Sequence, residues 1–348
     1  MSDTTAVSTL LSTPGAVEDV GRDAGVASHY GDPLREQRLL TDGLGVVDLS
    51  HRGVVQVTGP DRLTWLHSMT TQKIDDLPPY TSVESLVLSP KGHIEHSLHL
   101  VDDGETTWIT VEPGTAPALV EWLRSMQFML RVEVQDVTPA YAVLGEPINA
   151  ESTAQELESH GVIAWRDPWP AMGPDSAAYG RTDPHPATGR AWRELIVPRD
   201  TVLQMVDDRP LAGMWALEAL RIDAWRPRVL WETDHRTIPH ELDLLRTAVH
   251  LHKGCYRGQE TIARVHNLGK PPRRLVFLHL DGSGHTLPDV GAELVVSGAE
   301  RPIGRITSVG RHYEDGPIAL AVIKRNTPVD AVLEAGTVSA AQTVIVEP

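Results

Sequence analysis

Residues 53–58 alternate between apolar and polar side chains, and the pair Gly59-Pro60 ends the run. Such alternation predicts a half-buried β-strand. Asp61 is a favourable N-cap, and the leucines that follow it at helical spacing predict a helix. Further elements are predicted before residue 138: helices over 34–40 and 117–130, and strands over 82–88, 93–101, 106–111 and 131–137. From residue 53 on, the order β-α-β-β-β-α-β predicts an α+β unit with an antiparallel sheet rather than a doubly wound parallel one.

The pattern is less regular over residues 139–272. Pro and Gly are frequent over 145–190, where a helix is predicted near 150–160. The firmer predicted elements are segments over 194–197 and 199–207, helices over 213–224 and 260–268, and a structured loop over 226–250. From these residues alone, the region has no recognisable architecture.

The two ends of the chain differ in the structure that their sequences predict. From residue 273 on, short apolar runs are separated by Gly, Pro and Asp, and strands are predicted over 275–280, 293–296, 303–309, 318–323, 331–333 and 343–346. This spacing predicts a small all-β domain, a barrel. Residues 1–28 are rich in Ser, Thr, Ala and Gly without any period, and we expect a disordered tail there.

The charge balance limits the choice of partners. The chain of 348 residues has 31 basic and 47 acidic residues, a formal net charge of −16. A protein this acidic is not expected to bind nucleic acid through a broad basic surface, although a local Arg-rich pocket remains compatible with the composition. Cys255 is the single cysteine, so no intrachain disulfide can form, which fits a reducing compartment.

The hydropathy pattern gives no sign of a membrane protein. No segment approaches the roughly 18–20 consecutive apolar residues of a membrane helix. The N-terminus has neither a basic region nor a long apolar region of the kind found in signal peptides. We therefore expect a cytoplasmic protein with no membrane partner.

Several common chemical motifs are absent from the sequence. It contains no G-x-x-x-x-G-K-[ST] phosphate loop and no G-x-S-x-G nucleophile elbow. His93, Glu95 and His99 share one face of a predicted strand, but the two histidines lie roughly 20 Å apart on a regular strand, too far to share an ion. We interpret these side chains as a solvated face or a pocket wall, and we predict no metal ligand.

The most informative segment is residues 253–260, K-G-C-Y-R-G-Q-E, followed by Arg264. It places the single cysteine beside Lys253 and Arg257 in a loop that precedes a helix. Nearby cations and a helix N-terminus favour a reactive thiolate at Cys255. The alternative is that Cys255 is a small packed apolar side chain and that the glycines only give the backbone room.

The pattern K-G-C-Y-x-G-Q-E-x-x-x-R resembles the signature of the YgfZ-like folate-binding proteins, a branch of the glycine-cleavage T-protein (aminomethyltransferase) superfamily. The resemblance covers roughly residues 34–325. Further stretches agree with it in order: Gly45–Ser50 with Val57–Asp61, Leu220–Asp223 with Asp223 in the usual place of Glu, Ile238–Glu241, and Ile303–Ser308.

The resemblance implies a fold and a ligand. The fold is α+β: two ferredoxin-like units with antiparallel sheets and a C-terminal antiparallel β-barrel, arranged around a central channel that receives tetrahydrofolate. With this guide the chain divides into a tail (1–28), an N-terminal folate-binding unit (29–138), a second α+β unit that carries the signature loop (139–272) and the barrel (273–348).

The resemblance also implies which side chains form the site. Arg221 and Arg264 are the expected cations for the anionic folate tail, and Glu218 and Glu241 are the expected carboxylate partners of the pterin. The signature residues Tyr256, Gly258, Gln259 and Glu260 are further expected folate-binding residues. Cys255 and Lys253 are the expected catalytic residues, with Cys255 as a nucleophile or a transient ligand that faces the channel.

One departure from the superfamily distinguishes its branches. The aminomethyltransferases carry G-G-x-x-D-D where this chain has Gly92-His93-Ile94-Glu95-His96-Ser97, so the catalytic Asp is missing. The YgfZ-like interpretation implies an accessory protein that supports iron–sulfur cluster assembly or repair in client proteins and, through them, tRNA modification. The alternatives are a folate-dependent aminomethyl or one-carbon transferase, and an adaptor that kept the fold and lost the ligand.

Overall fold

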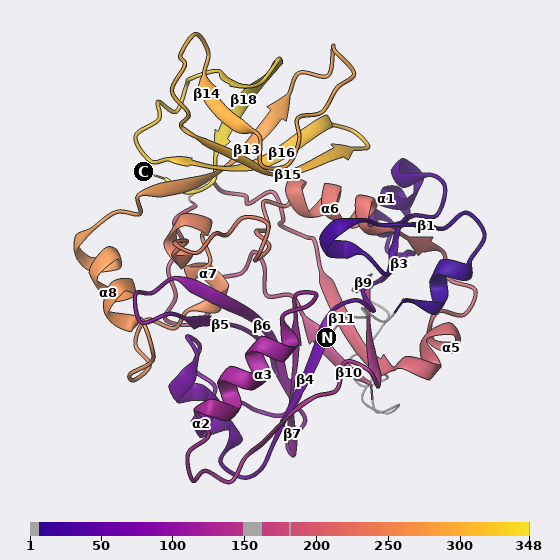
Figure 1. The fold of residues 1–348 in the computed structure, drawn as a ribbon, viewed down its shortest axis with the longest axis vertical. Helices are drawn as coiled ribbons and strands as arrows, with labels where there is room; N and C mark the ends of the chain where they lie inside the picture. Colours follow the sequence, from indigo (N-terminus) through magenta and orange to yellow (C-terminus); the bar gives the residue numbers. More distant parts are fainter. Residues whose placement is uncertain (1–6, 149–161, 181, 348) are drawn as a thin grey trace.

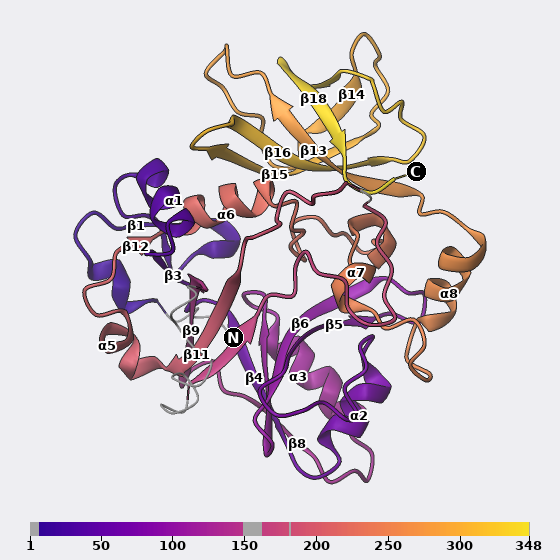
Figure 2. The ribbon, with the colours of Figure 1, turned by 180° about the vertical axis from the view of Figure 1, so that it is seen from behind.

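Three bodies of secondary structure surround the centre of the molecule in the computed structural model, which describes residues 7–148, 162–180 and 182–347. One sheet with its helices lies at the bottom of Figure 1, a second lies beside it, and a barrel lies above both; Figure 2 shows the same arrangement from behind. The helix predicted near 150–160 falls outside the described residues. In the described part of the chain, no helix is long and apolar enough to cross a membrane.

The first unit is a five-stranded antiparallel sheet in the order β5-β6-β7-β4-β8. Its elements are β4 (Gly53–Thr58), α2 (Arg62–Met69), β5 (Ser82–Leu88), β6 (Ile94–Asp102), β7 (Thr106–Val111), α3 (Ala116–Ser125) and β8 (Glu133–Asp136). Apolar faces of α2 and α3 bury Leu66 and Leu119 against Val55 and Ile109 of the sheet. The predicted strands are confirmed, but α3 ends five residues early because Phe128 and Met129 are exposed in a loop.

The second unit contains a sheet in the order β10-β11-β9-β3-β12. Its elements are α1 (Pro33–Thr41), β3 (Val46–Asp48), β9 (Tyr141–Pro147), β10 (Ile163–Arg166), β11 (Trp192–Pro198), η3 (Arg199–Thr201), α5 (Val202–Val206), β12 (Leu211–Ala212) and α6 (Met214–Asp223). β12 and β3 are paired in parallel, and the other neighbours are antiparallel. Because α1 and β3 come from the start of the chain, the predicted sequence boundary near residue 138 does not separate the two sheets in space.

The predicted structured loop after α6 fills the space between the sheets and the barrel. It contains η4 (Pro239–Leu242) and α7 (Leu245–Ala248), and α8 (Gln259–Leu268) follows it. Leu242, Leu245 and Val249 are buried in the cluster that also contains Leu86 of β5 and Phe277 of the barrel. The loop therefore forms the common core of the three bodies.

The C-terminal body is a closed barrel in the order β13-β16-β15-β14-β17-β18. Its strands are β13 (Arg273–Leu280), β14 (Glu293–Val296), β15 (Gly304–His312), β16 (Gly316–Lys324), β17 (Leu333–Ala335) and β18 (Val338–Val344). Helix α6 lies against β15 (Figure 1), where a Cβ on Gly310 would come within 3.2 Å of the Ala219 Cα. The predicted α+β fold with a C-terminal antiparallel barrel is confirmed.

The expectation of disorder is wrong for residues 7–28. This N-terminal segment contains η1 (Thr9–Ser12), β1 (Val17–Glu18), η2 (Gly21–Asp23) and β2 (Ala27–His29). One of its apolar residues is deeply buried: Leu10 packs against Leu144 and Leu195 of the second sheet. The sequence shows no period here because contacts with distant strands, rather than a regular local element, stabilise the segment.

We predict that the N-terminal segment contributes to global stability through Leu10. The Leu10 side chain is 2% exposed, so Leu10→Ala should lower the free energy of unfolding by about 2–5 kcal/mol, the usual cost of a cavity in a core. Urea unfolding followed by circular dichroism measures this change. Val7→Ala is the control, because Val7 is 64% exposed and its truncation should change the unfolding free energy by less than about 0.5 kcal/mol. Equal stability of the two variants would show that the segment does not pack on the sheet.

Candidate functional site

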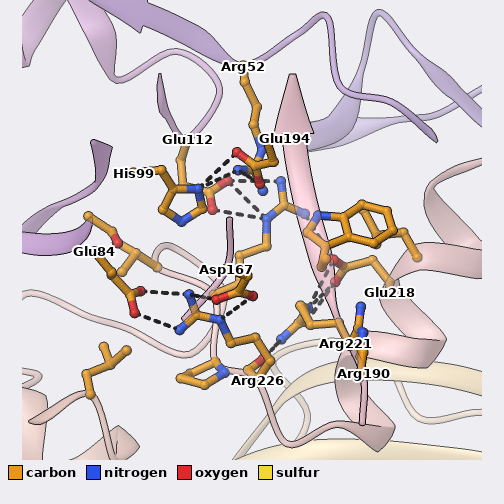
Figure 3. Close-up of a pocket in the computed structure, with 17 residues that line it drawn as sticks. Arg52, Glu84, His99, Glu112, Asp167, Arg190, Glu194, Glu218, Arg221 and Arg226 are labelled. Carbon is orange, nitrogen blue, oxygen red and sulfur yellow. Dashed lines mark hydrogen bonds and ion pairs between the residues drawn. The ribbon is translucent and has the colours of Figure 1, made fainter. Parts of the chain in front are cut away.

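A charged cavity lies where the two sheets meet α6 and the loop that follows it (Figure 3). Strands β5 and β6 and the segments beside β4 and β7 form one wall, and β11, α6 and residues 226–229 form the rest. The cavity is lined by Arg52, Glu84, Ser97, His99, Glu112, Asp167, Arg190, Trp192, Glu194, Leu217, Glu218, Arg221, Arg226, Pro227, Arg228, Val229 and Leu244. Its volume is about 60 Å³, room for a few water molecules.

Arginines and carboxylates alternate around this cavity. Its charged lining consists of Arg52, Arg190, Arg221, Arg226 and Arg228, and of Glu84, Glu112, Asp167, Glu194 and Glu218. Most of these side chains are buried. A buried charge is tolerated only with a partner of opposite charge and with hydrogen bonds, so the ion pairs fix where each side chain lies. The Arg-rich pocket that the composition left open is therefore present despite the acidic balance of the chain.

The first group of ion pairs centres on Glu194 of β11. Arg52 donates a 2.7 Å hydrogen bond to Glu194 Oε1, and His99 Nδ1 lies 3.0 Å from Oε2. The His99 ring stacks on Trp165 with a centroid separation of 3.7 Å, which fixes the imidazole plane. Burial alone would raise the pKa of Glu194, but the charges of Arg52 and His99 and their hydrogen bonds outweigh it and lower that pKa to about 2. Glu194 is thus a carboxylate anion.

The second group centres on Arg226. Its guanidinium contacts Glu84 at 2.8 Å and Asp167 at 3.1 Å, and the Thr247 hydroxyl also donates to Glu84. Burial by itself would raise the pKa of Glu84. The charge of Arg226 has the larger opposite effect, so the pKa of Glu84 is lower than its ordinary value. Figure 3 shows this group beside the Glu194 group.

The third group joins separate parts of the chain. Arg228 contacts Asp23 at 2.8 Å, Glu112 at 2.9 Å and Glu218 at 3.2 Å, and its guanidinium lies 3.5 Å from the centroid of the Trp231 ring. The N-terminal segment, the end of β7 and helix α6 therefore meet at one guanidinium.

Arg221 continues this group toward the barrel. It contacts Glu218 at 2.7 Å and Glu232 at 3.1 Å, and it donates a 2.7 Å hydrogen bond to the Ser308 hydroxyl of β15. The Ser308 hydroxyl in turn donates to Glu232. Helix α6 thus carries both Glu218 and Arg221 into the cavity and links it to β15.

The structure brings two of the predicted folate-binding residues together at the cavity, Glu218 and Arg221. Glu241 is fully buried elsewhere: it accepts a hydrogen bond from the Ile238 N–H and pairs with Arg273 at 2.8 Å, which ties η4 to β13. Arg264 is exposed on α8. Glu241 and Arg264 therefore lie away from the residues that line the cavity.

The signature loop docks on the outside of the first sheet. A Cβ on Gly258 would lie 2.6 Å from the Ser89 carbonyl oxygen and 3.0 Å from the Gly92 Cα, and the φ of Gly258 is +84°, so glycine is required there. Arg257 pairs with Glu95 at 2.9 Å. The loop therefore packs against the turn between β5 and β6.

Within the loop, Lys253 and Cys255 differ in their surroundings. The Lys253 ammonium donates to the carbonyls of His67, Thr70 and Gln72 at the end of α2, and burial lowers its pKa to about 8. Cys255 is exposed with a free thiol. The lining of the cavity includes neither residue, and their catalytic roles stay predictions.

The remaining signature residues shape the loop and the start of α8. Gln259 is the first residue of α8, and its side-chain oxygen accepts a 3.1 Å hydrogen bond from the Tyr256 N–H. Burial raises the pKa of Tyr256 to about 12, so its hydroxyl stays protonated. Glu260 is exposed in the first turn of α8. Their predicted roles in folate binding also stay predictions.

Sequence reasoning misses most of the residues that line the cavity. Arg226 and Arg228 follow Arg221 within seven residues, and such a cluster is unusual before a predicted loop. Glu84 and Glu194 each interrupt an apolar strand, and a carboxylate there is a signal for a buried pair. The pairing itself joins residues up to 205 positions apart and has no local pattern.

Comparisons with known proteins agree with this architecture. Residues 29–145 match the family described as GCVT N-terminal domain. A chloroplastic protein of Arabidopsis thaliana, named as a putative transferase, is 27% identical over 307 residues, 82% of this chain and 66% of that protein. The aminomethyltransferase of Thermotoga maritima is 26% identical over 319 residues, which cover 86% of this chain and 84% of the relative.

A solved structure has the same fold. The glycine cleavage system aminomethyltransferase T from Bartonella henselae superposes with a TM-score of 0.74 at 19% identity, over 96% of this chain and 94% of that one. This chain therefore has the fold of that aminomethyltransferase, and its sequence is similar to those of aminomethyltransferases and of a putative transferase.

The Glu194 group predicts a specific acid response. Because the pKa of Glu194 is lower in the folded chain than its ordinary value of 4.5, its ion pairs stabilise the fold above that value and lose their effect as the pH falls toward 2. Glu194→Gln should therefore lower the unfolding free energy by about 3–5 kcal/mol at pH 7, because Arg52 loses its partner. The deficit should shrink by about 2 kcal/mol at pH 3.

Urea unfolding at pH 7, 5 and 3 measures both effects. Glu300→Gln removes the same charge from an exposed carboxylate of the barrel and should change little at any pH. A Glu194→Gln deficit that does not depend on pH would contradict the assignment of Glu194 as a buried anion.

Proposed function

We propose that this chain is a tetrahydrofolate-binding protein of the YgfZ-like branch of the glycine-cleavage T-protein superfamily, and that it supports iron–sulfur cluster assembly or repair in client proteins. The observation that carries the folate proposal is the cavity of paired arginines and carboxylates at the junction of the three bodies. The sequence resemblance and the shared fold are consistent with that ligand.

The chemistry of the cavity suits the two polar ends of tetrahydrofolate. The pterin presents an amino group and a ring N–H side by side, and a carboxylate accepts two such parallel hydrogen bonds. The glutamate tail is anionic and requires a guanidinium. Glu218 is the proposed pterin partner and Arg221 the proposed tail partner, and Arg52 Nε is a buried donor without a hydrogen-bond partner among the described residues.

The small volume of the cavity implies that a bound folate replaces some of the ion-pair partners that now line it. A volume of about 60 Å³ is well below the roughly 300–1,000 Å³ of ligand pockets. A folate must therefore displace existing ion pairs, with its pterin edge replacing a guanidinium at a carboxylate and its tail replacing a carboxylate at a guanidinium. The anionic tail then pairs with the guanidinium that is released, while the carboxylate keeps hydrogen bonds from the neutral pterin edge in place of its cation.

A folate-dependent transferase of the aminomethyl type is the second candidate, because the relatives carry that name. The position of Glu95, the carboxylate of β6 nearest to Gly92, does not favour this transferase. Glu95 is exposed and paired with Arg257 outside the cavity, and burial lowers the pKa of His96 to about 4, so that imidazole is neutral. This part of β6 supplies no carboxylate to the cavity.

The proposed accessory role depends on Cys255, which lies at the surface of the molecule. An exposed free thiol is accessible to a partner protein, whereas a cluster requires several ligands and one cysteine provides one. Cys255 therefore acts together with ligands from a client or assembly protein in this proposal.

We predict that folate binding depends on Arg221. Titration calorimetry under anaerobic conditions with tetrahydrofolate and 5-formyltetrahydrofolate should show saturable binding, and Arg221→Met should weaken it by about tenfold or more, the usual cost of a lost charged hydrogen bond. Arg264→Met is the matched control, because Arg264 is exposed on α8, and its effect should stay within about twofold. Circular dichroism of each variant checks that the fold is intact. The absence of binding by the wild-type chain would refute the folate proposal, and a selective loss in Arg264→Met would move the tail site to α8.

We further predict that Cys255→Ser leaves folate binding and stability unchanged but impairs client maturation. The measurement is the activity of iron–sulfur enzymes in a strain that lacks its own copy of this protein and carries either the wild-type or the variant gene. Ser283→Ala, an exposed substitution on the barrel, is the control and should complement fully. Full complementation by Cys255→Ser would exclude the proposed role of the thiol, and turnover of an aminomethyl donor by the purified protein would favour the transferase instead.

A further inference from the structure

A second cavity lies on the other side of Arg190 and Trp192, which line both cavities. It is bounded by the end of α1, the end of α6 and the turn between β15 and β16, where helix and barrel lie side by side in both ribbon views. Its volume is about 460 Å³, within the range of ligand pockets. The proposed folate site does not use it.

Three potential metal ligands meet on the wall of this cavity. Asp223 ends α6, His312 ends β15, and Asp315 lies in the turn that follows. One ligand atom of each residue lies within 4.8 Å of the other two. No other His, Cys, Asp and Glu residues in the described ranges form such a group.

The spacing of the ligand atoms agrees with shared coordination. The His312 Nδ1 and Asp315 Oδ2 atoms are 3.4 Å apart. Two atoms that each lie about 2.1 Å from one ion are separated by roughly 3.0–4.2 Å in tetrahedral or octahedral geometry. Small side-chain rotations therefore bring all three residues to bonding distance.

The protein satisfies this ligand group only in part. The His312 ring is 6% exposed. Its Nδ1 accepts hydrogen bonds from the backbone N–H groups of Glu314 at 3.4 Å and Asp315 at 3.2 Å, whereas its Nε2 has no hydrogen-bond partner in the part of the chain that the structure describes. Asp223 and Asp315 have no Lys or Arg within 4.0 Å among the described residues, whereas the carboxylates of the central cavity each pair with an arginine.

We propose that Asp223, His312 and Asp315 bind one divalent transition-metal ion on the wall of the second cavity. One imidazole and two carboxylates form a ligand set that suits Zn²⁺ or Mn²⁺. Three protein ligands leave coordination positions for water or an oxygen anion on the cavity side. The ion would also join the end of α6 to the barrel, two residues beyond Arg221, and its binding does not depend on folate.

The test uses the full chain, freed of metal by dialysis against EDTA, in titrations with ZnCl₂ and MnCl₂. We expect one saturable site for at least one of the two ions. Asp223→Asn and Asp315→Asn should each weaken it by about tenfold or more, and the electron paramagnetic resonance of Mn²⁺ should show the same losses. Asp315 is exposed, so its substitution keeps the test valid if a change at a more buried ligand disturbs folding.

Glu314→Gln is the matched control, because Glu314 lines the same cavity and carries the same charge but lies outside the ligand group. Retention of binding in this variant, with loss in Asp223→Asn and Asp315→Asn, supports the site. The absence of saturable binding in the wild-type chain overturns the proposal, and so does an equal loss in Glu314→Gln, which would indicate diffuse attraction of cations. Folate titrations of the same samples report on the central cavity separately.

Discussion

The pairing of one buried guanidinium, that of Arg228, holds the architecture together. It contacts Asp23 of the N-terminal segment, Glu112 at the end of β7 and Glu218 of α6. A buried charge that loses its partners costs several kcal/mol, so each of these contacts is effectively obligatory. Contacts with Arg228 therefore help to fix how the first sheet, α6 and the N-terminal segment are placed relative to one another.

The same logic extends from Arg228 to the barrel through Arg221. Glu218 contacts both arginines, and Arg221 reaches Ser308 and Glu232. A chain of alternating charges thus runs from the first sheet through α6 to β15. In the proposed binding mode, a ligand that replaced one partner in this chain would change the contacts of the next, as far as Ser308 of β15.

How far the sequence predicts this molecule depends on the range of the interactions. Strands such as Thr106–Val111 are predictable with their observed bounds, because a run of β-branched and aromatic residues between turn residues is a local signal. The barrel follows from local runs and from the resemblance. The order in residues 7–28 does not, because Leu10 and Asp23 are fixed by partners more than a hundred residues away. The cavity is predicted only in part for the same reason: Glu218 and Arg221 are identified, but the other wall comes from distant segments that carry Arg52, Glu84 and Glu194.

Strand β6 connects the two features that sequence and structure single out separately. Side chains at positions 95, 97 and 99 of a regular strand would share one face, yet Glu95 holds Arg257 of the signature loop while Ser97 and His99 line the cavity. The pairing with β5 explains the difference. Val87 faces His96 and Leu88 faces Ile94, so Glu95 is the extra residue of a β-bulge.

A bulge leaves its extra residue outside the regular alternation and increases the local twist of the strand. The Glu95 carboxylate is therefore free to face the signature loop, although the alternation resumes with Ser97 toward the cavity. The loop that carries the exposed thiol and the buried ion pairs are thus attached to neighbouring positions of one strand. His99 lies four residues from Glu95 along β6, and Glu95 is joined to the signature loop by its ion pair with Arg257.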